Sequence, residues 1–261
     1  MVEYAAAVIQ GAGRPPILRD AMLRIAPQDE ATRILHPEEP RNARLHEGSG
    51  LATDARFQNL LPDADWRALP VAVRARFSAK PKIGAGAIFR GRTTSLRMNL
   101  AGRLFALLAR LVGAPLPIDD HSDQCDAIVA VTDAPRGQGQ VWTRLYARRD
   151  GFPQAIHSMK KFAGPTGLEE HVVDGRFFGA GMSLTLSVAG AALYFASDRY
   201  FVRILRWRFF LPNALAPGAM VIGHNDLGQG RFVFTLTLRH PAFGLMIEQE
   251  SVFEDMEACH G

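Results

Sequence analysis

The chain has 261 residues, of which 48% are hydrophobic and 21% are charged, and its formal net charge at pH 7 is +4. This composition excludes an intrinsically disordered or fibrous chain and is typical of a globular protein with one full core. The only cysteines are Cys125 and Cys259, without a C-x-x-C spacing, so a disulfide scaffold and a cysteine-based metal site are excluded.

No segment is typical of export or of a membrane-spanning helix. Residues 1–9 are partly apolar, but they lack a basic region and include Glu3, so we expect no signal peptide. The longest apolar run, residues 104–112, is interrupted by Arg110 and is shorter than the roughly 20 residues that span a bilayer. We therefore expect a cytoplasmic protein with no membrane span.

Residues 1–55 differ in character from the rest of the chain. They mix prolines, glycines and charges with little periodicity, which is typical of a flexible or weakly ordered extension. A segment left over from an upstream domain is the alternative interpretation. The compact domain is expected to cover residues 56–257.

A short helical layer opens this domain. Residues 57–61 present a helical face, and a second helix starts at Pro70, because proline is tolerated in a first turn. Val73 and Phe77 lie on one side of that helix.

The clearest helical pattern follows a predicted strand over residues 88–98. Residues 100–112 place five leucines at i, i+4, i+7, i+8 and i+11, which predicts a helix whose leucine face packs on the core. Gly113 ends this helix, and Pro115 prevents it from resuming.

The remainder of the chain alternates apolar and polar residues with a period of two. In residues 182–188, Met and Leu alternate with Ser and Thr, so one strand face is apolar and the other polar. Short Gly-containing connections separate the strands, as in hairpins. The predicted strands lie near residues 125–133, 139–149, 154–162, 168–173, 176–188, 192–209, 217–226, 231–239 and 243–254.

Sequential strands with short links form a meander, and a long meander curls because open sheet edges are costly. We therefore predict a mainly β fold, in which an antiparallel meander forms a barrel or strongly curved sheet with a short N-terminal helical layer. An α+β architecture is the alternative.

An ordered set of short motifs extends over residues 57–255. It includes Leu69-Pro70-Val71-Ala72-Val73-Arg74, Arg90-Gly91, Gly113-Ala114-Pro115-Leu116-Pro117, Trp142-Thr143-Arg144, Glu169-Glu170-His171, Leu211-Pro212-Asn213-Ala214-Leu215-Ala216-Pro217 and His240-Pro241-Ala242-Phe243-Gly244. Together these motifs resemble the DUF4166 family, an uncharacterised bacterial domain. The resemblance implies a stand-alone protein or a module beside an oxidoreductase domain, which makes an oxidoreductase a candidate partner. Family members carry a histidine shortly after the helix arginine, where this chain has Arg76-Phe77-Ser78.

Trp142, Arg144 and Tyr146 alternate along one face of a predicted strand. If this face lines a cavity, it offers stacking surface and a cation for a carboxylate or phosphate group. If it faces solvent, the arginine is simply hydrated. We favour the outward orientation, because an inward arginine is costly unless it is paired.

Glu169, Glu170 and His171 form the strongest titratable cluster. An ion pair between Glu170 and an inward arginine such as Arg144 is preferred to catalysis, in which Glu170 and His171 would act as acid and base.

Arg203 begins a run in which arginines alternate with aromatic residues, and it is a candidate ligand contact at a basic rim. The modest net charge and the lack of a known nucleic-acid module disfavour nucleic acid as a partner. His157, His224 and His240 lack the short spacing of a metal site, so we predict no metal and no cofactor.

These residues favour non-catalytic binding of a small amphipathic or lipid-like ligand in a β cavity. Arg144 would anchor the anionic head group, Glu170 would orient Arg144, and Trp142, Tyr146 and Arg203 would complete the site. The alternatives are a cofactor-free enzyme that uses Glu170 and His171, and a docking domain for an oxidoreductase. A filled, cavity-free barrel and an exposed apolar patch would favour the docking domain.

Overall fold

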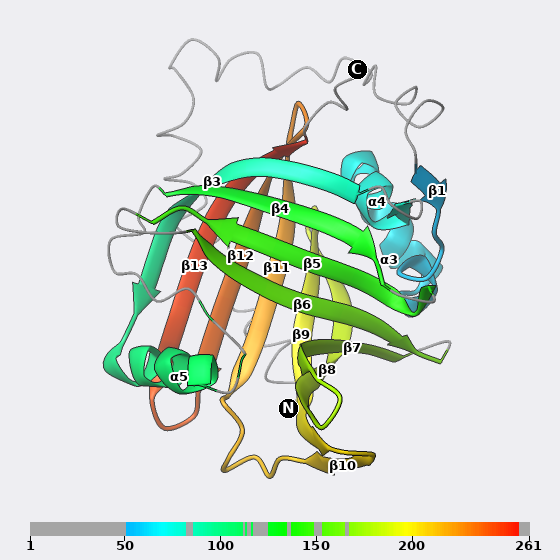
Figure 1. The fold of residues 1–261 in the computed structure, drawn as a ribbon. Helices are drawn as coiled ribbons and strands as arrows, with labels where there is room; N and C mark the ends of the chain where they lie inside the picture. Colours follow the sequence, from blue (N-terminus) through cyan, green and yellow to red (C-terminus); the bar gives the residue numbers. More distant parts are fainter. Residues whose placement is uncertain are drawn as a thin grey trace. The chain divides into compact units, whose positions relative to one another are not determined.

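The predicted antiparallel meander is confirmed, and it closes into a barrel. This computed structural model contains an eleven-stranded antiparallel sheet, in which every strand except β10 (Trp207–Phe210) belongs to a closed ring (Figure 1). In the ring, each strand pairs with the next ring strand along the chain, and the last strand pairs with the first. The ring comprises β3 (Gly86–Met98), β4 (Asp126–Asp133), β5 (Gly139–Tyr146), β6 (Gln154–Ala163), β7 (Gly167–Asp174), β8 (Phe178–Ala189), β9 (Ala192–Ile204), β11 (Ala219–Gly228), β12 (Arg231–His240) and β13 (Gly244–Asp255). Closure removes the unpaired edges that an open meander would expose.

The structure describes residues 51–81, 86–111, 113, 116, 125–134, 137–148, 153–164 and 167–255. They belong to a unit that spans Gly50–Gly261. Residues 1–50 of the predicted extension lie outside the described residues. Residues Leu51–Thr53 form β1, which pairs with β2 (Ala79–Pro81).

The predicted strand over residues 192–209 is two strands. It breaks at Leu205, whose φ is 54°, and the chain folds back so that β10 (Trp207–Phe210) pairs with the end of β9. Two-residue hairpin turns use positive φ angles and favour Asn or Gly. Leu205-Arg206 lacks this signature, and the sequence therefore reads as one continuous strand.

The N-terminal helical layer contains η3 (Gln58–Leu60), α3 (Asp63–Ala68) and α4 (Val71–Ser78). Pro62 and Pro70 stand immediately before α3 and α4, where a missing N–H has no helical partner. Arg76 of α4 pairs with Asp226 at 3.3 Å and with Asp255 at 3.2 Å, and its guanidinium lies 4.2 Å from the ring centroid of Phe232. These contacts fasten α4 to strands β11, β12 and β13.

The helix over residues 100–112 forms as α5 (Leu100–Leu111), but the orientation predicted for it is wrong. Its buried side is the small-residue face of Gly102, Ala106 and Ala109, whereas the leucines are exposed, from 52% at Leu107 to 84% at Leu100. A Cβ at Gly102 would lie 2.1 Å from the carbonyl oxygen of Met246, so only glycine allows this close approach to β13.

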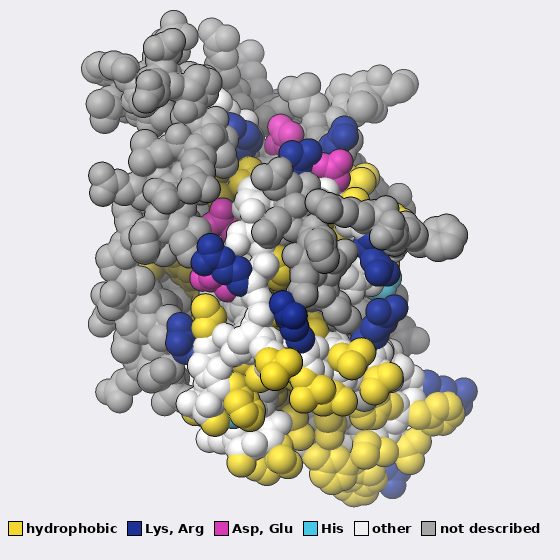
Figure 2. Space-filling model, turned by 90° about the vertical axis from the view of Figure 1, so that its left-hand side faces the viewer, with side chains coloured by type: hydrophobic (Ala, Val, Ile, Leu, Met, Phe, Trp, Pro, Cys, Tyr) yellow, Lys and Arg dark blue, Asp and Glu magenta, His cyan; other side chains and the backbone are white. Residues whose placement is uncertain are grey.

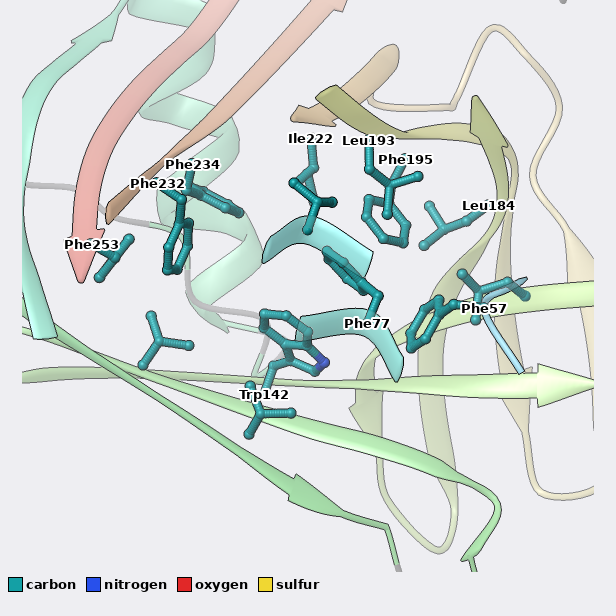
Figure 3. Close-up of a cluster of buried hydrophobic side chains, with 14 of the residues drawn as sticks. Phe57, Phe77, Trp142, Leu184, Leu193, Phe195, Ile222, Phe232, Phe234 and Phe253 are labelled. Carbon is teal, nitrogen blue, oxygen red and sulfur yellow. The ribbon is translucent and has the colours of Figure 1, made fainter. Parts of the chain in front are cut away.

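Aromatic side chains fill much of the barrel interior. Figure 3 shows Phe77 of α4 in the middle of this cluster. Its ring centroid lies 5.5 Å from that of Phe195 on β9, 6.4 Å from that of Trp142 on β5 and 5.2 Å from that of Phe57. The helical layer therefore contributes directly to the core that surrounds the candidate site.

Candidate functional site

The aromatic and arginine face of β5 points into the barrel. Trp142, Arg144 and Tyr146 are buried, whereas Leu145 between them is exposed. This is the less favoured of the two orientations considered from the sequence. Its cost is reduced because the neighbouring strands supply partners for the arginine.

The Arg144 side chain meets residues from β6 and β7. Its Nη1 donates a hydrogen bond to Ser158 Oγ at 3.2 Å, and its Nη2 lies 3.7 Å from Glu170 Oε1. The other oxygen of Glu170 accepts a hydrogen bond from Lys160 Nζ at 3.1 Å. Antiparallel pairing of β6 with β7 places Lys160 directly opposite Glu170.

This inner polar cluster of Arg144, Lys160 and Glu170 contains two cationic groups for one carboxylate. Burial lowers the pKa of Lys160, and Arg144 acts in the same direction against the opposing effect of Glu170. Burial alone would raise the pKa of Glu170, but Lys160 and Arg144 outweigh it and hold that pKa below its ordinary value. Glu170 is therefore a carboxylate at neutral pH, and the cluster carries an excess of positive charge when Lys160 is protonated.

A cavity of about 10 Å³ lies beside Arg144, which is about the space for one water molecule. Its lining is mostly apolar: Phe89, Val129, Trp142, Arg144, Tyr146, His224, Phe232, Phe234 and Phe253. The lining side chains that carry a polar group are Trp142, Arg144, Tyr146 and His224. Tyr146 Oη accepts a hydrogen bond from Gln249 Nε2 at 3.2 Å.

His224 is one of two interior residues, with Lys160, that the sequence analysis did not place in the binding site. Its ring stacks on Phe232 and meets Phe77, Trp142 and Phe234 edge-on, and its buried Nδ1 has no hydrogen-bond partner within the described part of the chain. Burial, with Lys160, Arg76 and Arg144 nearby, lowers the pKa of His224 to about 3. The sequence could have indicated this position, because His224 follows the apolar Ile222 by two residues and therefore shares its inward face of β11.

Two other sequence-predicted residues lie away from this cluster. Because neighbouring strand residues point to opposite faces, His171 is directed away from Glu170. The His171 ring contacts Phe201, and its Nε2 lies 2.9 Å from Glu169 Oε2, while Arg208 of β10 forms an ion pair with Glu169 at 2.6 Å. Glu170 and His171 therefore do not form a shared acid–base pair.

Arg203 is likewise engaged elsewhere. Its Nη2 donates to Asp174 Oδ1 at 3.2 Å and to the Gly175 carbonyl at 2.7 Å, and its Nη1 donates to the Leu205 carbonyl at 2.9 Å. These bonds connect Arg203 to the link between β7 and β8 and to the turn between β9 and β10. The structure thus brings together Trp142, Arg144, Tyr146 and Glu170 of the predicted set, and adds Lys160 and His224.

No group of three or more His, Cys, Asp or Glu side chains suited to a metal ion occurs among the residues that the structure describes. Within the same residues, no helix is long and apolar enough to cross a bilayer.

A comparison with curated proteins finds no match. Among solved structures, the chain is similar to the crystal structure of Rv2717c from M. tuberculosis, with 14% sequence identity and a TM-score of 0.37 over 72% of this chain and 99% of that one. The family model described as "Domain of unknown function (DUF4166)" matches residues 69–253, which include the barrel strands from β3 to β12 and most of β13. The chain therefore belongs to the DUF4166 family.

Proposed function

We propose that this domain is a binding protein that takes a small amphipathic anion into the barrel, with the anionic group at Arg144 and the apolar part among the aromatic side chains. The observation that carries the proposal is the position of Arg144 in the cavity wall, where it shares a single carboxylate with Lys160.

The charge balance supports an anionic ligand. A buried cation is costly unless it is paired, and when Lys160 is protonated Glu170 neutralises only one of the two cations around it. A ligand carboxylate at Arg144 would complete the pairing, and a guanidinium is suited to bind it through two parallel hydrogen bonds. Binding would also raise the lowered pKa of Lys160 by adding a negative charge nearby.

The size of the cavity restricts the ligand. A volume of about 10 Å³ admits a water molecule, so a larger ligand enters only if the surrounding aromatic side chains repack. Short-chain carboxylates demand the least repacking, and long acyl chains the most. The proposal therefore narrows the lipid-like ligand expected from the sequence to a small one. The exposed leucines of α5 are a feature expected of a docking domain, but the barrel is not free of cavities, and the cavity beside Arg144 favours ligand binding over docking.

Binding is favoured over catalysis for a geometric reason. Glu170 already accepts contacts from Lys160 and Arg144, and its pKa is lowered, which makes it a weak general base. His224 is neutral and lines the same cavity, but the charged groups near it are cations, and its Nδ1 has no hydrogen-bond partner among the described residues.

The test is isothermal titration calorimetry with a series of linear carboxylates from butyrate to palmitate. We expect the shorter members to bind the wild-type protein and the Arg144→Gln variant to bind them roughly tenfold to a hundredfold more weakly, the loss expected for one charged hydrogen-bonded contact. Arg144→Gln leaves Glu170 paired with Lys160, so the fold is expected to persist, which thermal melting will check.

Arg148→Gln is the matched control, because Arg148 lies four residues further along the same segment and is exposed. It should bind like wild type. Equal binding by all three proteins, or no binding of any carboxylate by the folded wild type, would refute the proposal.

A further inference from the structure

The exposed leucine face of α5 is a feature that the proposed function does not use. Leu100, Leu104, Leu107, Leu108 and Leu111 are all more than half exposed, and so is Phe243. Asn99, immediately before the helix, donates from Nδ2 to the Phe243 carbonyl at 2.9 Å, so Phe243 lies beside the start of α5. We call these six residues the leucine patch.

The leucine patch is presented on a rigid support. Asn99 caps the helix by accepting a hydrogen bond from the Gly102 N–H at 2.8 Å, and Phe105 packs against the cluster of Leu238, Met246 and Ile247. The close contact of Gly102 with β13 holds the opposite face of the helix on the barrel. The leucines consequently cannot be buried by rotating α5 in place.

The charged residues of α5 are basic. Arg103 and Arg110 are both exposed. Arg97, on the strand that leads into the helix, is 73% exposed and lies 4.0 Å from Glu248 of β13. Figure 2, which faces the side where α5 lies in Figure 1, shows hydrophobic side chains gathered over the lower part, with Lys and Arg along its margin and Asp and Glu above it.

We propose that α5 docks this protein on an anionic lipid bilayer, with the leucine patch inserted among the acyl chains and the arginines among the headgroups. A helix with leucines on one face and only arginines as charged residues is typical of segments that lie in the membrane interface. With 12 residues, α5 is about 18 Å long, too short to span the hydrocarbon core. This inference does not depend on the ligand in the barrel.

Charge favours a bilayer over a second copy of the chain. In a symmetric dimer through the leucine patch, the same surface would meet itself, so Arg103 and Arg110 would face arginines of the other copy. Anionic headgroups instead offer opposite charge, and each basic residue near the surface adds to the attraction.

The experiment is co-flotation of the full chain with vesicles of phosphatidylcholine alone or mixed with phosphatidylserine. We expect binding to the mixed vesicles that is at least about tenfold tighter than to phosphatidylcholine alone and that weakens as salt rises. Leu104→Ser with Leu108→Ser should abolish binding to both. These side chains are exposed, so circular dichroism should show unchanged melting.

The matched control is Ile128→Ser with Leu145→Ser, a cross-strand pair of exposed apolar residues on the barrel wall. It should float like wild type. The proposal fails if wild type floats with neither vesicle, or if the leucine variant floats as well as wild type. It also fails if light scattering finds a dimer that the leucine variant converts to monomer, because a second copy then covers the patch.

Discussion

At the residue scale, His224 makes the interior sensitive to acid. The pKa of His224 in the folded protein is about 3, against an ordinary value of 6.5. As pH falls below about 6.5 the unfolded chain takes up a proton at this residue and the folded chain does not, so stability is lost as pH falls toward 3. At 1.36 kcal/mol for each unit, the loss between pH 6.5 and 5 is roughly 2 kcal/mol.

Replacement of His224 by phenylalanine should remove this part of the pH dependence. The ring already stacks on Phe232 and is surrounded by aromatic neighbours, so His224→Phe keeps much of the packing while removing the titrating group. Urea denaturation at pH 7 and pH 5 measures the difference. An unchanged pH dependence in His224→Phe would show that His224 is not buried as a neutral ring.

The inward face of β5, which carries the inner polar cluster's Arg144, could not be predicted from the sequence. The alternation of Trp142, Arg144 and Tyr146 predicted that they share a face, but not which face is inward. That depends on Ser158, Lys160 and Glu170, which lie on other strands and become neighbours only through the register of β5, β6 and β7. The cost of an inward arginine argued for the wrong face because these partners were not visible in the sequence.

Among the elements, α4 contributes a large side chain, Phe77, to the barrel interior, and the effect of removing that side chain can be measured. Phe77 contacts Phe57, Trp142, Phe195 and His224, so Phe77→Ala should cost about 3 to 5 kcal/mol of unfolding free energy. The same change leaves space next to the cavity-lining residues Trp142 and His224. We therefore expect longer carboxylates to bind the variant more tightly than wild type, as seen by calorimetry.

Phe243→Ala is the control for this substitution, since Phe243 is 58% exposed and should change stability by less than about 0.5 kcal/mol. If Phe77→Ala were as mild as Phe243→Ala, α4 would not fill the interior in the way described. If Phe77→Ala were destabilised but bound carboxylates of each chain length as wild type does, Phe77 would not limit the size of the binding site.

The prediction that the leucine face of α5 packs on the core failed for a different reason. The helical spacing of the leucines correctly located the helix, because it shows that one face is apolar. The spacing does not show whether that face lies against the core or is exposed to solvent. The small residues Gly102, Ala106 and Ala109 decide this, since they allow the backbone to approach β13 more closely than leucines would.

In the whole molecule, the barrel was predictable because each strand of the ring pairs with the next ring strand along the chain. Local alternation and short turns therefore determine nearly all of the topology. Closure of β13 on β3 followed from the cost of open edges. The filled interior was not predictable, because the helical layer enters it from outside the sheet and its side chains take the space that a hollow barrel would leave.

If the barrel interior accepts an anion at Arg144, a crystal structure of the wild-type protein with 2-bromobutyrate will show the ligand there. We expect anomalous bromine density inside the barrel and a carboxylate oxygen within about 3 Å of the Arg144 guanidinium. Bromine found only at exposed arginines, with an interior as closely packed as before, would contradict it.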